Sequence, residues 1–458
     1  MNLTLSDSPT GEDQLQRDNE YPALNDNLLW QVLESANIQA AWQQVRRNKG
    51  AAGIDGITIE QFPGWIRPQW QTLEGKLQSG RYRPQPVKRV RIPKDDGSER
   101  LLGIPTVLDR ILQQSIVQVL SPLFDPTFSK QSYGFRPNRS AHDAVRQVST
   151  YCQQQRKIAV DIDLSKFFDR VNHDLLMTLL GRRIRDKGLL QLIGRFLRCG
   201  IIDGATLIPS RAGVPQGGPL SPLLSNVMLD VLDKELENRG HHFARYADDL
   251  IIMVKSQRAG ERVMQSLTSF IERDLKLKVN TEKSQVVPST QCKFLGFSFH
   301  GRRIYWLPKS IAKFKHEVRK LTNRTRGTSM QAKLRKLSVY LCGWINYYGI
   351  ANRYQQCVDL DSWIRRRVRM CYWKQWRKPR TKVRKLLQLG VPLRAAISCG
   401  ISSKSYWRSS KTAGINMGLG NKYLQQQGLF ALRDGWIAFH HGVSFHNKRH
   451  RSLWIFSV

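Results

Sequence analysis

The stretch ARYADDLIIMV at residues 244–254 decides the fold of this chain. Apolar residues dominate both of its ends, and the adjacent acids Asp248 and Asp249 interrupt it. We expect two short strands around a tight turn, which would lift both carboxylates to one end of a sheet. An isolated Asp-Asp pair more often forms only a turn. Chemistry is therefore indicated only if further acids can meet this pair.

A second acidic strand end lies upstream of this stretch. The segment KIAVDIDLSKFF (157–168) begins as an apolar strand and carries Asp161 and Asp163 where that strand ends. Carboxylates gathered from separate strands repel one another unless a cation holds them. Nucleotidyl transfer needs such a gathering, because it uses two divalent ions about 3.5–4 Å apart. We therefore expect Asp163 to join Asp248 and Asp249 at a metal site.

The charge of the chain points to a polyanionic partner. Among 458 residues, 73 Lys and Arg stand against 36 Asp and Glu, a formal net charge of +37. Such a field favours nucleic acid, although an acidic membrane surface or a merely solvated basic surface would produce the same balance. The seven cysteines form no CxxC pair, and no apolar run approaches the roughly 18 residues of a membrane span. We expect a cytoplasmic protein in a reducing compartment, without membrane contact.

Periodicity outlines the other elements. Apolar residues recur at helical spacing from Leu28, the segment PVKRVRIPK (86–94) alternates like an exposed strand, and a helix is expected from Val107 to Leu120. The Gly/Pro loop VPQGGPLSP (214–222) precedes another helix, for which Ser221 is the expected N-cap.

A change in composition near residue 306 indicates a domain boundary. Acids become scarce there, while cations alternate with aromatic residues at helical spacing. We expect a leader over residues 1–27, a catalytic region over 28–305, a basic helical region over 306–398 and a small basic module over 399–458.

The box Tyr246-Ala247-Asp248-Asp249 resembles the catalytic box of reverse transcriptases, and six further blocks follow the order of that family. The blocks are RIPKDDGSERLLGIPTVLDRILQQ (91–114), SYGFRPNRSAHDAV (132–145), DIDLSKFF (161–168), VPQGGPLSP (214–222), LKLKVNTEKSQ (275–285) and FLGFSF (294–299). The first two resemble fingers blocks of group II intron reverse transcriptases. The resemblance implies an α+β right-hand polymerase, with fingers and palm over residues 28–305 and an α-helical thumb and maturase region after them.

The same resemblance implies roles for individual residues. Asp163, Asp248 and Asp249 would be catalytic metal ligands. Asp161 is a rival, but the family has an aromatic residue five positions after the first acid, and Phe168 stands at that distance from Asp163. Phe168 would be the steric gate that excludes a ribose 2′-hydroxyl, although taken alone it is more often a core residue.

Four further residues would bind the nucleotide by resemblance: Lys94, Arg100, Gln216 and Lys283. Lys94 and Arg100 resemble the cations that grip the triphosphate, Gln216 the contact to the sugar, and Lys283 the palm lysine near the leaving phosphate. Solvated surface cations are the alternative for the charged residues, and an ordinary turn is the alternative for PQGG.

The basic region resembles the thumb and maturase region, and residues 403–429 resemble the DNA-binding segment that follows it. Its candidate nucleic-acid contacts are Arg365, Arg366, Arg367 and Arg369. The nearby tryptophans suit base stacking and core packing equally well. Many group II intron proteins add a nuclease module with cysteine ligands, which we do not expect here. The histidines at 440, 441, 446 and 450 are more consistent with a basic tail than with a nuclease site.

These observations predict an RNA-directed DNA polymerase of a mobile group II intron, which would also act as a maturase. Expected cofactors are two Mg²⁺ ions, and expected partners are the structured intron RNA, an RNA template with a DNA primer, dNTPs and target DNA. A monomer and a dimer are both compatible with the sequence. The alternatives are a related enzyme used in phage defence or repair, whose chemistry would be identical, and an RNA-binding splicing factor, which the three acids argue against.

Overall fold

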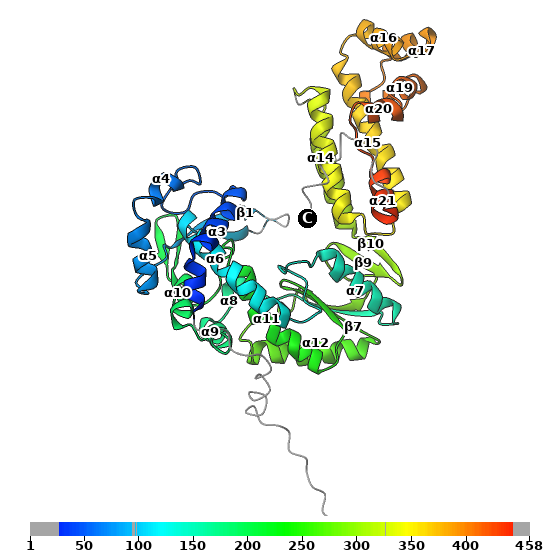
Figure 1. The fold of residues 1–458 in the computed structure, drawn as a ribbon. Coiled ribbons are helices and arrows are strands. Elements are labelled where there is room, and N and C mark those ends of the chain that lie inside the picture. The colour runs from blue at the N-terminus through cyan, green and yellow to red at the C-terminus, as the bar shows by residue number, and fades with distance from the viewer. Residues whose placement is uncertain (1–26, 94–96, 98, 326, 443–458) are drawn as a thin grey trace, which may run out of the picture. The chain divides into compact units, whose positions relative to one another are not determined.

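The chain divides into two compact units in this computed structural model, which describes residues 27–93, 97, 99–325 and 327–442 (Figure 1). The first unit comprises residues 1–151 and 156–287, and the second comprises residues 152–155 and 288–458.

The acidic box lies in a four-stranded sheet of the first unit, with strand order β6-β7-β3-β8. The bounds are β3 Ile158–Ile162, β6 Phe243–Tyr246, β7 Asp249–Val254 and β8 Gln285–Pro288. β7 is antiparallel to both β3 and β6, and its residues from Leu250 to Val254 are buried. The expected pair of strands around a central turn is confirmed.

A second sheet of the same unit carries the exposed basic ribbon, with strand order β2-β1-β4-β5. The bounds are β1 Val87–Pro93, β2 Glu99–Ile104, β4 Ile201–Asp203 and β5 Thr206–Ile208. β1 and β2 form an antiparallel hairpin, and β1 runs parallel to β4. The expected ribbon is confirmed, whereas Lys94 lies outside the described residues.

Helices pack around these sheets. They are α2 Leu28–Leu33, α3 Ser35–Arg47, α4 Phe62–Ile66, α5 Trp70–Gln78, α6 Val107–Phe124, α7 Ala141–Gln153, α8 Phe167–Arg170, α9 His173–Gly181, α10 Lys187–Arg198, α11 Ser221–Asn238 and α12 Gln257–Arg273, with a 3-10 turn, η2, at Asp125–Thr127. The helical pattern that starts at Leu28 is split, because Glu34 adopts an extended conformation between α2 and α3. α6 is capped by Thr106 and inserts Leu112, Ile116 and Leu120 into the core.

The expected N-cap of α11 is wrong. Leu220 already has helical backbone angles, so the helix begins at Ser221 and has Pro222 in its first turn. The Ser221 hydroxyl donates instead to the Pro215 carbonyl at 2.6 Å. This bond closes the Gly/Pro loop onto the start of the helix, a tertiary use of a residue type that usually caps locally.

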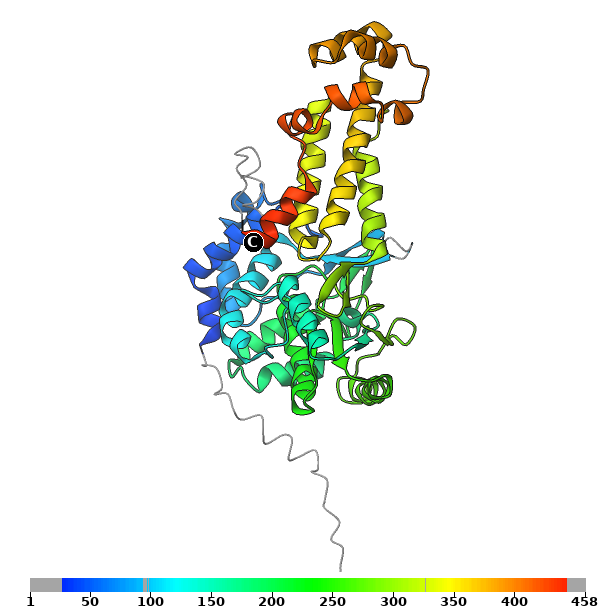
Figure 2. The ribbon, with the colours of Figure 1, turned by 90° about the vertical axis from the view of Figure 1, so that its right-hand side faces the viewer.

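The second unit begins with a hairpin and is otherwise helical. Its elements are β9 Phe297–His300, β10 Arg303–Trp306, α13 Pro308–Leu321, α14 Met330–Tyr348, α15 Tyr354–Gln375, α16 Pro379–Gln388, α17 Leu393–Gly400, α18 Tyr406–Ser409, α19 Ala413–Gly418, α20 Asn421–Gln426 and α21 Leu432–His441. α14 and α15 lie side by side in Figures 1 and 2. Trp344 of α14 packs on Trp306, Phe314 and Tyr348, which joins the hairpin to the helices.

The mixed α+β fold class with an α-helical extension is confirmed. Among the described residues, no helix combines the length and the apolar character that crossing a bilayer requires.

Candidate active site at the acidic hairpin

The acidic pair lies on a two-residue turn between β6 and β7. Tyr246 and Asp249 form the last pair of the ladder, so Ala247 and Asp248 make the turn itself. Ala247 has a φ of +57°, in the left-handed region that an alanine rarely occupies. Asp249 begins β7 and keeps access to solvent, while Leu250 behind it is buried. A buried strand thus anchors two acids at its open end.

Asp163 lies beside this turn. It follows β3 directly, and the β3–β7 register pairs Ile162 with Leu250. In an antiparallel ladder the next residues of the two strands also face each other. The register therefore brings Asp163 next to Asp249, as expected for three acids that act together.

A segment that follows α12 holds the main chain of Asp163. The Asn280 amide donates to the Asp163 carbonyl at 2.8 Å, and the Asp163 amide donates to the Ser284 hydroxyl at 3.0 Å. The sequence analysis selected only Lys283 from this segment, and Lys283 is exposed. Ser284 and Asn280 were missed because small polar residues in a loop carry no periodic signal.

The neighbouring carboxylates at the acidic end of the sheet affect the pKa of Asp249. Desolvation by the surrounding protein raises the pKa of Asp249 to about 7, and the negative charges of Asp248, Asp161 and Asp163 act in the same direction. Because the side chain keeps access to solvent, we regard the neighbouring charges as an essential part of this shift. The acids are therefore close enough to repel one another.

The donor atoms at this end fit a magnesium ion. Carboxylate oxygens are hard ligands, and mutual repulsion among them is relieved by a bound cation. In the part of the chain that the structure describes, no three His, Cys, Asp or Glu side chains are arranged tightly enough to hold a metal by themselves.

Replacing Asp249 by Asn should stabilise the metal-free protein at pH 8. The folded pKa of this acid lies above its unfolded value, so the folded protein binds more protons than the unfolded chain between pH values of about 4 and 7. Stability therefore falls as the pH rises through that window, and it stays lower above pH 7. Asn removes this effect. Thermal melting in EDTA should show a higher Tm for the variant than for the wild type at pH 8, and no difference in Tm between the two proteins at pH 4. Equal Tm values of variant and wild type at pH 8 would contradict the prediction.

Two predicted nucleotide-binding residues meet at the Gly/Pro loop. The Arg100 Nε donates to Gln216 Oε1 at 3.1 Å, and the Gly103 amide donates to the Gln216 carbonyl at 2.6 Å. Gly217 has a φ of +117°, and a Cβ there would lie 2.4 Å from the Gly103 carbonyl oxygen. Only glycine permits this close approach of the loop to β2. The loop is thus docked on the ribbon that carries Arg100.

Phe168 connects the same loop to the acidic sheet, although its ring is in the core. The side chain is 8% exposed and packs edge-on against Phe167, with ring centroids 5.1 Å apart. Its carbonyl accepts a hydrogen bond from the Val214 amide at 2.6 Å. Phe168 therefore fills the core and also fixes the start of the PQGG loop.

The arginines predicted to bind nucleic acid are largely engaged within the second unit. Arg366 lies 3.6 Å from the Trp407 ring centroid and donates to the Trp407 carbonyl at 3.1 Å. Arg367 donates to Thr322 Oγ1 at 2.6 Å, and Arg369 donates to the Leu419 carbonyl at 2.9 Å.

The fourth arginine, Arg365, lines a cavity with Asp361 and Arg433. Within the described residues, the hydrogen bonds of Arg366, Arg367 and Arg369 attach α15 to neighbouring segments of the second unit. These arginines therefore have fewer N–H donors left for phosphates than unengaged arginines would have.

The histidine-rich tail has a structural contact at its start. His440 Nε2 lies 2.8 Å from the Gly349 carbonyl oxygen, and its ring stacks on Trp436 with centroids 3.9 Å apart. His446 and His450 lie outside the described residues.

Comparison with known proteins adds independent findings. Residues 92–299 match the family described as reverse transcriptase (RNA-dependent DNA polymerase), and residues 311–390 match the group II intron, maturase-specific domain. Protein YkfC of Escherichia coli (strain K12) is 34% identical, over 56% of this chain and 77% of its own length.

Group II intron-encoded protein LtrA of Lactococcus lactis subsp. cremoris is 29% identical, over 57% of this chain and 55% of its own length. The chain thus spans about half the length of that relative. A chain of the solved structure "Partial Cas6-RT-Cas1--Cas2 complex" is 26% identical with a TM-score of 0.35, and the match covers 55% of this chain and 45% of that one.

Proposed function

We propose, from the premise that this chain belongs to the group II intron family of reverse transcriptases and carries that family's maturase-specific domain, that it extends a DNA primer on an RNA template. The observation that supports the proposal is the meeting of Asp163 with the Asp248 and Asp249 turn at the open end of a buried sheet. Acids that repel one another at a solvent-accessible strand end suit phosphoryl chemistry and have no role in packing.

Asp163, Asp248 and Asp249 would hold two Mg²⁺ ions. When bound, these ions lower the pKa of the primer 3′-hydroxyl and neutralise the charge on the leaving pyrophosphate. The acids contribute the fixed negative charge that recruits the ions, and the ladder between β3 and β7 keeps their spacing constant. Such fixed placement means that little reorganisation is needed during the reaction.

The nucleotide would lie between the acidic turn and the docked Gly/Pro loop. Arg100 presents a planar guanidinium that suits phosphate oxygens, and Gln216 already accepts one of its hydrogen bonds. The triphosphate of an incoming nucleotide would compete with Gln216 for the Arg100 N–H group. Lys94 and Lys283 would supply further positive charge to the phosphates. Phe168 would exclude a 2′-hydroxyl by bulk, and its packed position would make that barrier rigid.

The second unit would bind the intron RNA and thereby assist splicing and mobility. Because Arg366, Arg367 and Arg369 are engaged in protein contacts, the phosphate contacts would come from exposed cations near the end of α15 and the start of α16, such as Arg377, Lys378 and Arg380. Exposed cations on helices position a phosphate backbone without reading its sequence. Target DNA would bind through the region that follows, in a cytoplasmic setting.

Purified protein should synthesise cDNA from a primed RNA template when given dNTPs and Mg²⁺. Substitution of NTPs for dNTPs should reduce extension strongly, because the ribose 2′-hydroxyl would meet Phe168. Product length on denaturing gels measures both. The proposal would be abandoned if wild-type protein that binds the primed template made no cDNA under any Mg²⁺ concentration.

A further inference from the structure

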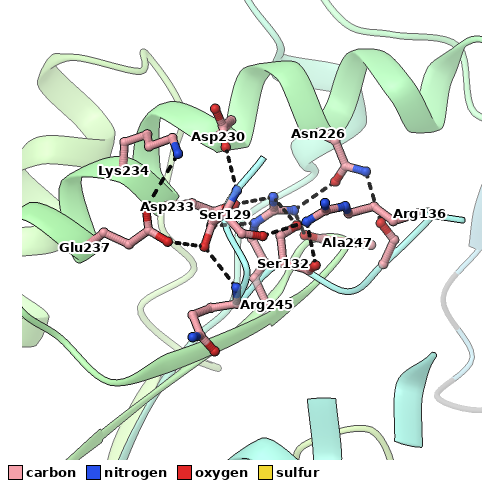
Figure 3. A network of polar contacts seen from close by, with 12 residues as sticks. Ser129, Ser132, Arg136, Asn226, Asp230, Asp233, Lys234, Glu237, Arg245 and Ala247 are labelled. Carbon is pink, nitrogen blue, oxygen red and sulfur yellow. Dashed lines mark hydrogen bonds and ion pairs between the residues drawn. The ribbon is translucent and has the colours of Figure 1, made fainter. Parts of the chain in front are cut away.

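A buried ion pair lies directly behind the acidic turn (Figure 3). Arg245 precedes the YADD box by one position and is 1% exposed, while Asp233 of α11 is completely buried. The Arg245 Nε donates to Asp233 Oδ1 at 2.7 Å, and Nη2 forms the second arm of the fork with Oδ2. This is the bidentate geometry that gives arginine its strongest pairing with a carboxylate.

The remaining donors of Arg245 reach the turn and a neighbouring segment. Nη1 donates to the Ala247 carbonyl at 2.9 Å and to Asn226 Oδ1 at 3.1 Å, and Nη2 donates to the Ser132 hydroxyl at 2.8 Å. An arginine has five N–H donors. All five are therefore matched to acceptors, one of which is the main chain of the catalytic turn.

The turn is confined from its other side as well. A Cβ on Gly134 would lie 2.2 Å from the Ala247 nitrogen, so the main chain at Gly134 packs directly on the turn. Asn226 Nδ2 donates to the Gly134 carbonyl at 3.0 Å, and the Tyr133 amide donates to the Arg245 carbonyl at 2.8 Å. Segment 132–134, part of a block that the sequence analysis assigned to the fingers, is thus attached to the turn through Arg245 and Asn226.

Stability alone does not explain this arrangement. Replacing a buried ion pair by apolar residues of similar volume is often neutral or stabilising, because desolvation of the charges offsets their attraction. Ala247 meanwhile adopts a left-handed conformation that costs an alanine about 1–2 kcal/mol. Something must hold this turn in a conformation that its own residues disfavour.

We propose that Arg245, clamped by Asp233, is a positioning residue that fixes the Ala247 carbonyl and thereby the placement of the Asp248 and Asp249 carboxylates for catalysis. This inference rests on the proposed polymerase function. Arg245 does not touch the reacting atoms, so its effect passes through the turn. Removal of such a supporting hydrogen bond behind metal ligands typically lowers metal affinity or activity about 10–100-fold.

Arg245→Lys is the first test, because lysine keeps the charge but has only three donors and no planar fork. We expect the single-turnover extension rate to fall about 10–100-fold and the Mg²⁺ concentration for half-maximal rate to rise. The Kd for primed template should stay at the wild-type value. Arg239→Lys is the matched control. Arg239 is the C-cap of α11, the helix that carries Asp233, and it pairs with Glu235 at the exposed end of that helix.

The double variant Arg245→Met with Asp233→Leu separates positioning from stability. It removes both buried charges together, so its Tm should stay near or above that of the wild type, whereas its extension rate should remain as low as that of Arg245→Lys. A double variant with wild-type extension would overturn the proposal, because the pair would then serve packing only. If the double variant does not fold, the comparison of Arg245→Lys with Arg239→Lys decides alone.

Hydrogen–deuterium exchange supplies a readout that does not depend on polymerisation. In metal-free full-length protein, peptides covering residues 244–250 should exchange faster in Arg245→Lys than in the wild type and in Arg239→Lys. Equal exchange would overturn the inference even if the enzyme were inactive. A wild type without polymerase activity would contradict the proposed function instead, so failures of the two claims are distinguishable.

Discussion

The variant Asp248→Ala should lose measurable primer extension on an RNA template, a decrease of about a thousandfold or more. Alanine removes a carboxylate that we assign to metal binding, and no other side chain occupies the same place on the turn. The fold should survive, because Arg245 and Gly134 hold the turn through the main chain of Ala247. Removing one of several repelling acids should even favour the folded state.

RNA binding by Asp248→Ala should be unchanged, since one charge in a net +37 alters the overall field little. Primer extension and filter binding on the same preparations measure the two effects. Asp274→Ala is the matched control, because Asp274 pairs only with its exposed neighbour Arg273 among its described ion pairs and the variant has the same net charge. Extension retained by Asp248→Ala, or lost equally by Asp274→Ala, would refute the assignment.

Affinity for RNA should fall steeply with salt. A protein that contacts six to ten phosphates loses about 10³–10⁵ in affinity between 50 and 200 mM monovalent salt, because binding releases condensed counterions. The excess of 73 basic over 36 acidic residues makes a contact number in that range reasonable. The Kd measured at several salt concentrations yields the slope of log Kd against log salt.

Variants at exposed and engaged arginines make this measurement more specific. Replacing exposed Arg380 by Gln should reduce the salt slope by about one unit, while replacing Arg367, which is bonded to Thr322, should mainly lower the Tm. Asp248→Ala provides a reference with the wild-type slope. A Kd that does not respond to salt would exclude an electrostatic RNA interface of this size.

Several strands and the order of the motifs could be predicted from the sequence alone. Strand β7 shows as an uninterrupted apolar run after two acids, and it is buried along that run. The basic ribbon β1 shows as an alternation of apolar and basic residues, although Val87 is its only buried residue. The order of the seven blocks pointed to the polymerase family, and the family matches at residues 92–299 and 311–390 agree with it.

The hydrogen-bond partners of polar side chains were harder to predict from the sequence. The arginines of α15 have a charge pattern typical of a nucleic-acid surface, yet three of them donate to protein acceptors on α18, after α13 and after α19. Ser221 has the residue type and the place of an N-cap, yet its hydroxyl closes a loop. In each case a polar side chain has several possible partners, and composition does not say which is nearest.

What the sequence by itself determined is the strands around the acidic box, the basic ribbon, several of the helices, the acidic character of one strand end and the family, because these depend on local periodicity and on motifs in order. Only the tertiary structure decided that Asp163 faces Asp249, that Ser284 and Asn280 hold the main chain of Asp163, and that Arg245 divides its donors between Asp233 and the acidic turn. The bond from Arg245 to Asp233 spans 12 positions of the chain, and the bond from Asp163 to Ser284 spans 121. They follow from strand register and close packing, which no single segment of the chain specifies alone.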